Sequence, residues 1–156
     1  MTLSEAMTAR HSVRSFTDKK FDGKTAVDLQ SYIKECNRQS GFSFQLFLDE
    51  PDAFSGRLAH YGSFSDCKNY IAVVGPKNAD EKCGYYGEKL VLKAQQLGLN
   101  SCWVAMSYSK SKVRCSIKKG EKLYVVIALG YGKNQGKAHK SKSMSELCRA
   151  DGEMPD

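Results

Sequence analysis

Two arginines, a histidine and a serine stand close together near the N-terminus, in the stretch RHSVRSF of residues 10–16. The guanidinium groups of Arg10 and Arg14 each present a planar fork of donors that matches two phosphate oxygens at once. Ser12 adds a neutral donor and His11 adds an imidazole. These residue types indicate an anion site, and one phosphate group is the ligand that fits them best. An ordinary solvated surface segment is the alternative that local composition leaves open.

A short helix should carry this stretch. Thr2 and Glu5 have the spacing of a capping box, which predicts a helix over residues 3–9 that ends at Arg10. Residues 13–16 then have an extended pattern.

The rest of the chain alternates helical and strand patterns. Residues 53–66 have a weak pattern and are predicted to be loop or short helix. The strand nearest the N-terminus alternates apolar and polar residues, so we expect one of its sides to be solvated. Four apolar strands between helices predict one α+β or α/β layered domain over residues 1–156. The predicted helices are residues 25–37, 79–97, 109–117 and 145–149, and the predicted strands are residues 42–49, 69–76, 101–106 and 121–129.

Composition narrows the class of protein. The 156 residues are 41% hydrophobic and 26% charged, which is usual for a globular domain. No apolar run approaches the roughly 20 residues that cross a bilayer, and the N-terminus lacks the regions of a signal peptide. We therefore expect a cytoplasmic protein with no membrane association. The six cysteines include no C-x-x-C pair, so neither a metal site nor a disulfide framework is expected, while a reactive thiol at Cys83 or Cys102 stays open.

The formal net charge of +7 favours anionic partners, and the lysine-rich residues 133–142 carry much of it. Phosphorylated cofactors and nucleic acids both fit that charge. No helix combines a basic stripe with exposed aromatic residues, so the pattern disfavours nucleic acid. The common dinucleotide, nucleotide, zinc and serine-hydrolase motifs are absent. A cofactor that brings its own reactivity therefore fits better than chemistry by side chains alone.

Three segments resemble the flavin-dependent nitroreductase family, in particular its compact bacterial branch. They are RHSVRSF at residues 10–16, GYYGEKLVLKAQQLGLNSCWV at residues 84–104 and IALGYG at residues 127–132. The resemblance implies an α+β domain with a central, mostly antiparallel sheet flanked by helices. It also implies a homodimer with FMN in a groove between the subunits. Hydride would pass from NAD(P)H to the flavin and then to a nitroaromatic, quinone or similar small acceptor in ping-pong turnover.

The resemblance also assigns site residues. It implies that the N-terminal stretch holds the FMN phosphate, that two late lysines join it, and that the start of the long helix lies beside the flavin ring. It assigns no catalytic side chain, and it leaves Trp103 open as a pocket wall or a core residue. The implied cofactor-binding residues are Arg10, His11, Ser12, Arg14, Cys83, Gly84, Lys140 and Lys142.

One family feature is missing. Members of this branch continue into an A-P-[ST]-x-x-N-x-Q motif that contacts flavin and helps to join the subunits, and this sequence has no such motif. The expectation is a chain shortened at its C-terminus. The alternative function is accordingly a flavin- or anion-binding remnant of the fold without catalysis.

Overall fold

The structure is a computed structural model that describes residues 1–138 and 142–149. Four strands form one sheet in the order β1-β2-β4-β3, and every neighbouring pair is antiparallel. This arrangement confirms the predicted α+β fold with a central antiparallel sheet. The strands are β1 (Ser43–Phe47), β2 (Asn69–Pro76), β3 (Asn100–Val104) and β4 (Glu121–Gly130).

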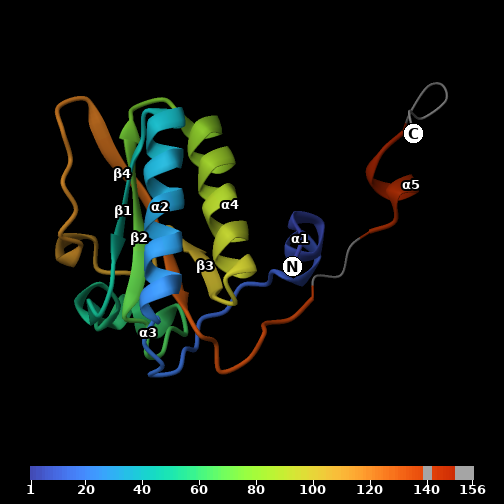
Figure 1. The fold of residues 1–156 in the computed structure, drawn as a ribbon, viewed down its shortest axis with the longest axis horizontal. Coiled ribbons are helices and arrows are strands. Elements are labelled where there is room, and N and C mark those ends of the chain that lie inside the picture. Colours follow the sequence, from blue (N-terminus) through green and yellow to red (C-terminus); the bar gives the residue numbers. More distant parts are fainter. Residues whose placement is uncertain (139–141, 150–156) are drawn as a thin grey trace.

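Helices cover one face of this sheet. The two long helices lie side by side on that face, and a short N-terminal helix packs against the second of them (Figure 1). None of the helices in residues 1–138 and 142–149 is both long and apolar enough to span a membrane. The helices are α1 (Leu3–Ala9), α2 (Gly23–Ser40), α3 (Arg57–Tyr61), α4 (Asp80–Gln96) and α5 (Met144–Leu147), with 3₁₀ turns at Pro51–Phe54 and Lys110–Lys112.

The sheet separates two hydrophobic cores. Leu29 and Ile33 of α2 and Leu90 of α4 are fully buried in the core on the helical side. On the opposite face, Phe54 and Phe64 pack against Tyr70 and its neighbours in the second core. The two central strands β2 and β4 are buried on both sides, as the apolar run at residues 69–76 predicts.

The helix ends follow their capping residues. The predicted capping box is present, since the Thr2 hydroxyl accepts a hydrogen bond from the Glu5 amide and the Glu5 carboxylate accepts one from Thr2. Helix α2 ends at Gly41, whose φ of 75° is the left-handed conformation that glycine adopts without strain. The same helix begins two residues before the predicted start, because the Asp22 carboxylate accepts a hydrogen bond from the Thr25 amide.

The expectation of a solvated side on the first strand holds only in part, since Ser43 and Gln45 on that side are half-buried. Phe47 stacks on Tyr70 with ring centroids 5.0 Å apart and joins the second core. Phe44 packs into the helical core on the other face. Both sides of β1 therefore contact apolar residues, which a strand at the edge of a sheet covered on both faces must do.

The predicted basic helix at residues 109–117 is also wrong beyond its first turn. Only Lys110–Lys112 forms a 3₁₀ turn, and the chain then becomes extended. Val113 and Cys115, two residues apart, both pack against the second core, which is the period of an extended chain and not of a helix. The backbone of Ser116 exchanges two hydrogen bonds with the Gln45 side chain, at 2.8 and 2.9 Å, and this holds the segment against β1.

Candidate functional site

The N-terminal stretch runs as an extended strap between β3 and the segment that follows β4. The Val13 amide donates to the Ser101 carbonyl oxygen at 3.0 Å, and the Thr17 amide donates to the Tyr131 carbonyl oxygen at 2.8 Å. Val13 and Phe16 insert into the second core and are each 1% exposed. The strap, residues 12–17, is therefore fixed by its apolar side chains, while the polar residues between them are left at the surface.

The segment after β4 folds back onto this strap. The Asn100 side chain holds the turn, since its Oδ1 accepts from the Gly132 amide at 2.9 Å and its Nδ2 donates to Gln135 Oε1 at 3.0 Å. Gly136 then lies against His11, and a Cβ at position 136 would stand 2.6 Å from the His11 Cβ. Only glycine fits there, so the close approach carries Lys137 to the strap.

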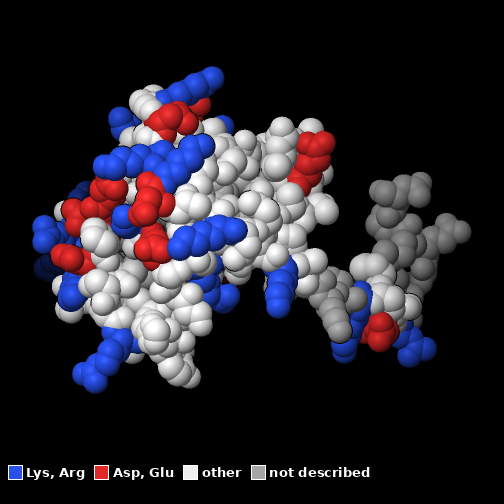
Figure 2. Space-filling model, turned by 90° about the horizontal axis from the view of Figure 1, so that it is seen from below, with Lys and Arg blue, Asp and Glu red and all other residues white. Residues whose placement is uncertain are grey.

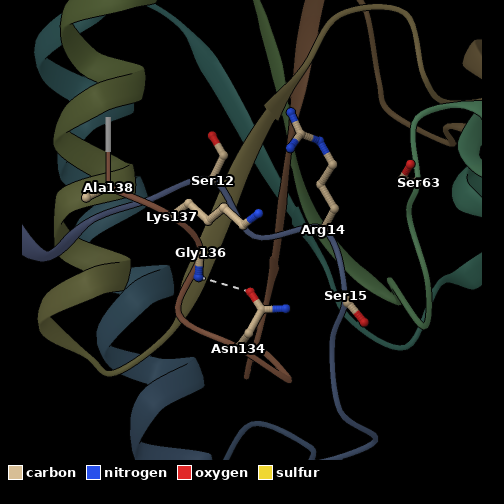
Figure 3. Close-up of a pocket in the computed structure, with 8 residues that line it drawn as sticks. All are labelled: Ser12, Arg14, Ser15, Ser63, Asn134, Gly136, Lys137 and Ala138. Carbon is tan, nitrogen blue, oxygen red and sulfur yellow. Dashed lines mark hydrogen bonds between the residues drawn. The ribbon is translucent and has the colours of Figure 1, made fainter. Parts of the chain in front are cut away.

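A polar cavity of about 610 Å³ opens where these two segments meet (Figure 3). Arg14 and Lys137 bring two cationic side chains to it, and Ser12 brings a hydroxyl from the strap. Ser63 comes from a third segment, between α3 and β2, on the other side of Arg14 (Figure 3). The residues that line the cavity are Ser12, Arg14, Ser15, Ser63, Asn134, Gly136, Lys137 and Ala138.

The chemistry of this lining is that of an anion site. Among the described residues, the lining holds both charged and neutral donors and no carboxylate. The nearby Lys133 is neutralised by Asp66, with Nζ 2.8 Å from Oδ2, so Arg14 and Lys137 carry the positive charge of the lining. A phosphate group matches such a set because its oxygens accept from a guanidinium, an ammonium and hydroxyls together.

The structure divides the predicted N-terminal residues between two places. Ser12 and Arg14 line the cavity, and His11 lies behind it against Gly136. Arg10 does not line the cavity. Its Nε lies 3.5 Å from Glu88 Oε1 on α4, and its side chain is only 18% exposed.

Glu88 joins Arg10 to the only tryptophan. The Glu88 carboxylate accepts a hydrogen bond from Trp103 Nε1 at 3.0 Å, and the Trp103 ring lies directly against Gly87. Arg10 Nη1 is buried and has no hydrogen-bond partner among the described residues. The charge of Arg10 is thus directed toward α4 and away from the cavity.

The residues predicted at the start of α4 lie apart from this lining. The Cys83 thiol is buried in the helical core, and burial raises its pKa. Gly84 is exposed, and nothing lies within 4 Å of the Cβ that another residue would carry there. Burial also raises the pKa of the Cys102 thiol, although Arg14 and a hydrogen bond from Ser12 lower it in part. Neither thiol has the partly exposed setting that reactivity needs.

The structure describes only one of the two lysines predicted to bind the phosphate. Lys142 is exposed and does not line the cavity, and Lys140 lies outside the described residues. Lys137, which sequence reasoning passed over within the basic run at residues 133–142, lines the cavity instead. The sequence did contain a signal for Lys137, since Gly136 and Lys137 come six and seven residues after the end of β4 at Gly130. Ser63 carried no such signal, because its segment is joined to the strap only in the folded chain.

Comparisons with known proteins point the same way. The family model described as "Putative TM nitroreductase" matches residues 2–156. A nitroreductase family protein of Clostridium difficile 630 is similar in structure, with a TM-score of 0.71 and 17% identity over 97% of this chain and 99% of that chain. A protein of Desulfovibrio desulfuricans described as a putative nitroreductase in complex with FMN has a TM-score of 0.70 and 14% identity over 97% and 98% of the two chains.

A third similar structure, of Parabacteroides distasonis ATCC 8503, is described as a putative NADH dehydrogenase/NAD(P)H nitroreductase. It has a TM-score of 0.71 and 19% identity over 96% of this chain and 98% of that chain. At these identities the likeness is one of fold. No curated protein matches this sequence at a significant level.

Proposed function

We propose that this chain, which belongs to the nitroreductase family whose model it matches, is an FMN-dependent NAD(P)H oxidoreductase. Members of this family are generally oxidoreductases. The observation that carries the proposal is the cavity at the strap, where the described lining contains Arg14 and Lys137 and no carboxylate. The nitroreductase-like structure of Desulfovibrio desulfuricans that is described with FMN supports the choice of cofactor. The description of the Parabacteroides distasonis protein supports the choice of electron donor.

The residues at the cavity fit the phosphate end of FMN. Arg14 and Lys137 would neutralise the phosphate, and the Ser12 hydroxyl would donate to one of its oxygens. Gly136, with a φ of 78°, allows the backbone after β4 to lie against the strap. A cavity of about 610 Å³ has room for a phosphate and part of the chain attached to it.

FMN, when bound, would supply the redox chemistry, which is hydride transfer from NAD(P)H to a nitroaromatic, quinone or similar small acceptor in ping-pong turnover. The chain's own residues bind and orient. Arg14 and Lys137 hold the anionic end, and Arg10 with Glu88 fixes the start of the strap against α4. No side chain is assigned as an acid or base.

A homodimer is part of the proposal. Leu3, Met7 and Tyr85 are 53%, 59% and 64% exposed, and they line an apolar hollow of about 290 Å³ where α1, α2 and α4 meet. Exposed apolar side chains that gather on one face mark an interaction surface. A second copy of the chain is the occupant we propose, since a twofold contact would bury these side chains against their own equivalents.

A cytoplasmic location is proposed as well, and the six free thiols support it because disulfides are scarce in a reducing compartment. Nucleic acid is not proposed as a partner. On the face in Figure 2, lysine and arginine side chains lie among acidic ones. Several lysines pair with carboxylates, such as Lys20 with Asp49 at 2.9 Å and Lys68 with Asp18 at 2.7 Å. Such a mixed surface does not offer the continuous basic stripe that a nucleic acid needs.

The test is flavin binding followed by turnover. The purified full chain is mixed with FMN, and the flavin absorbance and fluorescence are compared with those of free FMN. NADH and NADPH consumption is then measured with a quinone and with a nitroaromatic acceptor. A shifted flavin spectrum and oxidation of either nucleotide support the proposal, while unchanged flavin signals would overturn it. FMN binding without nucleotide oxidation would favour the non-catalytic binding protein instead.

A further inference from the structure

Ser63 has a backbone conformation that serine rarely adopts. Its φ is 60°, in the left-handed region, and it follows Gly62 at the end of α3. For residues other than glycine, asparagine and aspartate this conformation is strained, because the Cβ lies too close to the following carbonyl oxygen. Such strain persists where the surrounding structure fixes the residue, and it gathers at binding sites.

Both neighbours of Ser63 are held in place. Phe64 packs into the second core with its ring centroid 5.0 Å from that of Phe54. Gly62 lies so close to Ser107 that a Cβ at position 62 would stand 2.3 Å from the Ser107 Cβ. Ser63 therefore cannot relax without moving a buried aromatic residue or a tight backbone contact.

Ser65, two residues after Ser63, ties this loop to the strap. The Ser65 amide donates to the Arg14 carbonyl oxygen at 3.0 Å, and the Ser65 and Ser15 hydroxyls are 2.7 Å apart. Ser63 is thus carried on a segment bonded to the same strap that presents Arg14. The Ser63 side chain is exposed and lines the cavity.

Three separate segments surround the cavity, and each supplies a donor. The strap supplies Ser12 and Arg14, the segment after β4 supplies Lys137, and the loop before β2 supplies Ser63 (Figure 3). A phosphomonoester has three terminal oxygens, so donors on three sides can each take one. A donor on the third side also fixes the rotation of the phosphate, which two cations alone leave free.

We propose that Ser63 is a ligand-binding residue that donates its hydroxyl to a phosphomonoester group in this cavity, and that its left-handed backbone serves to aim that hydroxyl. The proposal rests on the proposed function for the identity of the ligand, FMN, but the binding of a phosphate group by Ser63 does not depend on redox activity. It makes Ser63 a residue that distinguishes FMN from riboflavin, which lacks the phosphate.

The test compares two variants of Ser63 with one control. S63A removes the hydroxyl and keeps the strained backbone, whereas S63G removes both. The control N78G replaces another left-handed residue, with a φ of 63°, beyond the far end of β2. Eight residues of strand separate the two loops by about 25 Å, so N78G leaves the cavity untouched. Affinities for FMN and riboflavin are measured by fluorescence titration, and melting temperatures by calorimetry.

Both Ser63 variants should bind FMN about tenfold more weakly or worse, because a hydrogen bond to a charged group is lost, with riboflavin binding unchanged. S63G should melt at or above the wild-type temperature, so that its lost affinity does not reflect unfolding. N78G should bind FMN as the wild type does. Unchanged FMN affinity in S63A and S63G, or equal losses for FMN and riboflavin, would overturn the assignment of Ser63.

A second measurement separates this inference from the proposed function. Inorganic phosphate is titrated against the melting temperature of the wild type and S63A. If the wild type binds neither flavin, yet phosphate stabilises it more than S63A, the FMN function fails and the role of Ser63 stands. If phosphate stabilises neither protein and no flavin binds, both proposals fail.

Discussion

Arg10 and Glu88 join the end of α1 to the middle of α4, with the guanidinium Nε 3.5 Å from the carboxylate Oε1. The same carboxylate accepts a hydrogen bond from the Trp103 indole on β3. One acidic residue thus ties together the end of α1, the long helix and the edge of the sheet. The strap that presents Ser12 and Arg14 begins two residues after this contact.

The stability losses from removing each partner of this pair should not add. E88Q leaves the mostly buried Arg10 charge without a counter-charge, and R10M leaves Glu88 with Trp103 alone. Each single variant is expected to lose about 1–3 kcal/mol of unfolding free energy. The double variant R10M/E88Q should lose less than the sum. Urea unfolding of all four proteins measures the coupling, and strictly additive losses would show that the pair does not interact.

Gly84 and Gly87 on α4 form a matched pair with opposite expected effects. A Cβ at position 87 would stand 2.2 Å from Trp103 Cη2, so G87A must displace the indole ring and should lower the melting temperature. Nothing lies within 4 Å of a Cβ at position 84, so G84A should stabilise the helix by about 0.5–1 kcal/mol. Thermal unfolding checks both. A FMN affinity that falls in G84A while stability rises would support the predicted flavin contact at Gly84.

The Arg14 charge should strengthen the binding of FMN more than the binding of riboflavin. R14M removes a guanidinium from the cavity and is expected to weaken FMN binding at least tenfold, with little effect on riboflavin. R38M is the matched control, because Arg38 pairs with Glu35 on α2 and does not line the cavity. Fluorescence titration of both variants measures their affinities for FMN and riboflavin. Equal losses of FMN affinity in R14M and R38M would point to net charge and not to a site.

Thiol labelling should follow burial. Burial raises the pKa of Cys102 and of Cys83, so at pH 7.5 less of each thiol is the reactive thiolate than in an exposed cysteine. Cys148 is exposed and should react first with iodoacetamide. Mass spectrometry of the native and the urea-unfolded protein provides the comparison. Fast native labelling of Cys102 would mean that the strap opens far more readily than its hydrogen bonds indicate.

The proposed dimer surface can be tested with two methionines. M7E places a charge in the apolar hollow beside Leu3 and Tyr85 and should convert a dimer to a monomer. M106E is the control, since Met106 is 83% exposed but does not line this hollow. Light scattering after size-exclusion chromatography gives the mass of each. A dimer that persists in M7E and dissociates in M106E would contradict the proposed interface and assign it to the surface around Met106.

The local signals in the sequence determined most of the elements. A capping box at Thr2 and Glu5 and glycines at 41 and 98 set helix ends, because capping depends on residues within one turn. The apolar run at residues 69–76 predicted strand β2 with the bounds that the structure shows. The anion-binding character of the strap was also readable, since it follows from the residue types of Ser12 and Arg14.

Tertiary contacts decided what the sequence left open. Residues 109–117 became extended because Val113 and Cys115 pack on the core, and no local pattern records a core that other segments build. Arg10 turned to Glu88, 78 positions further along the chain, and Lys137 and Ser63 met Arg14 only when β4 and the loop before β2 were placed beside the strap. The charge and the donor type of a side chain are properties of a single residue, so they can be read directly from the sequence. The partner of each group depends on chain segments that are distant in sequence, so only the fold assigns it.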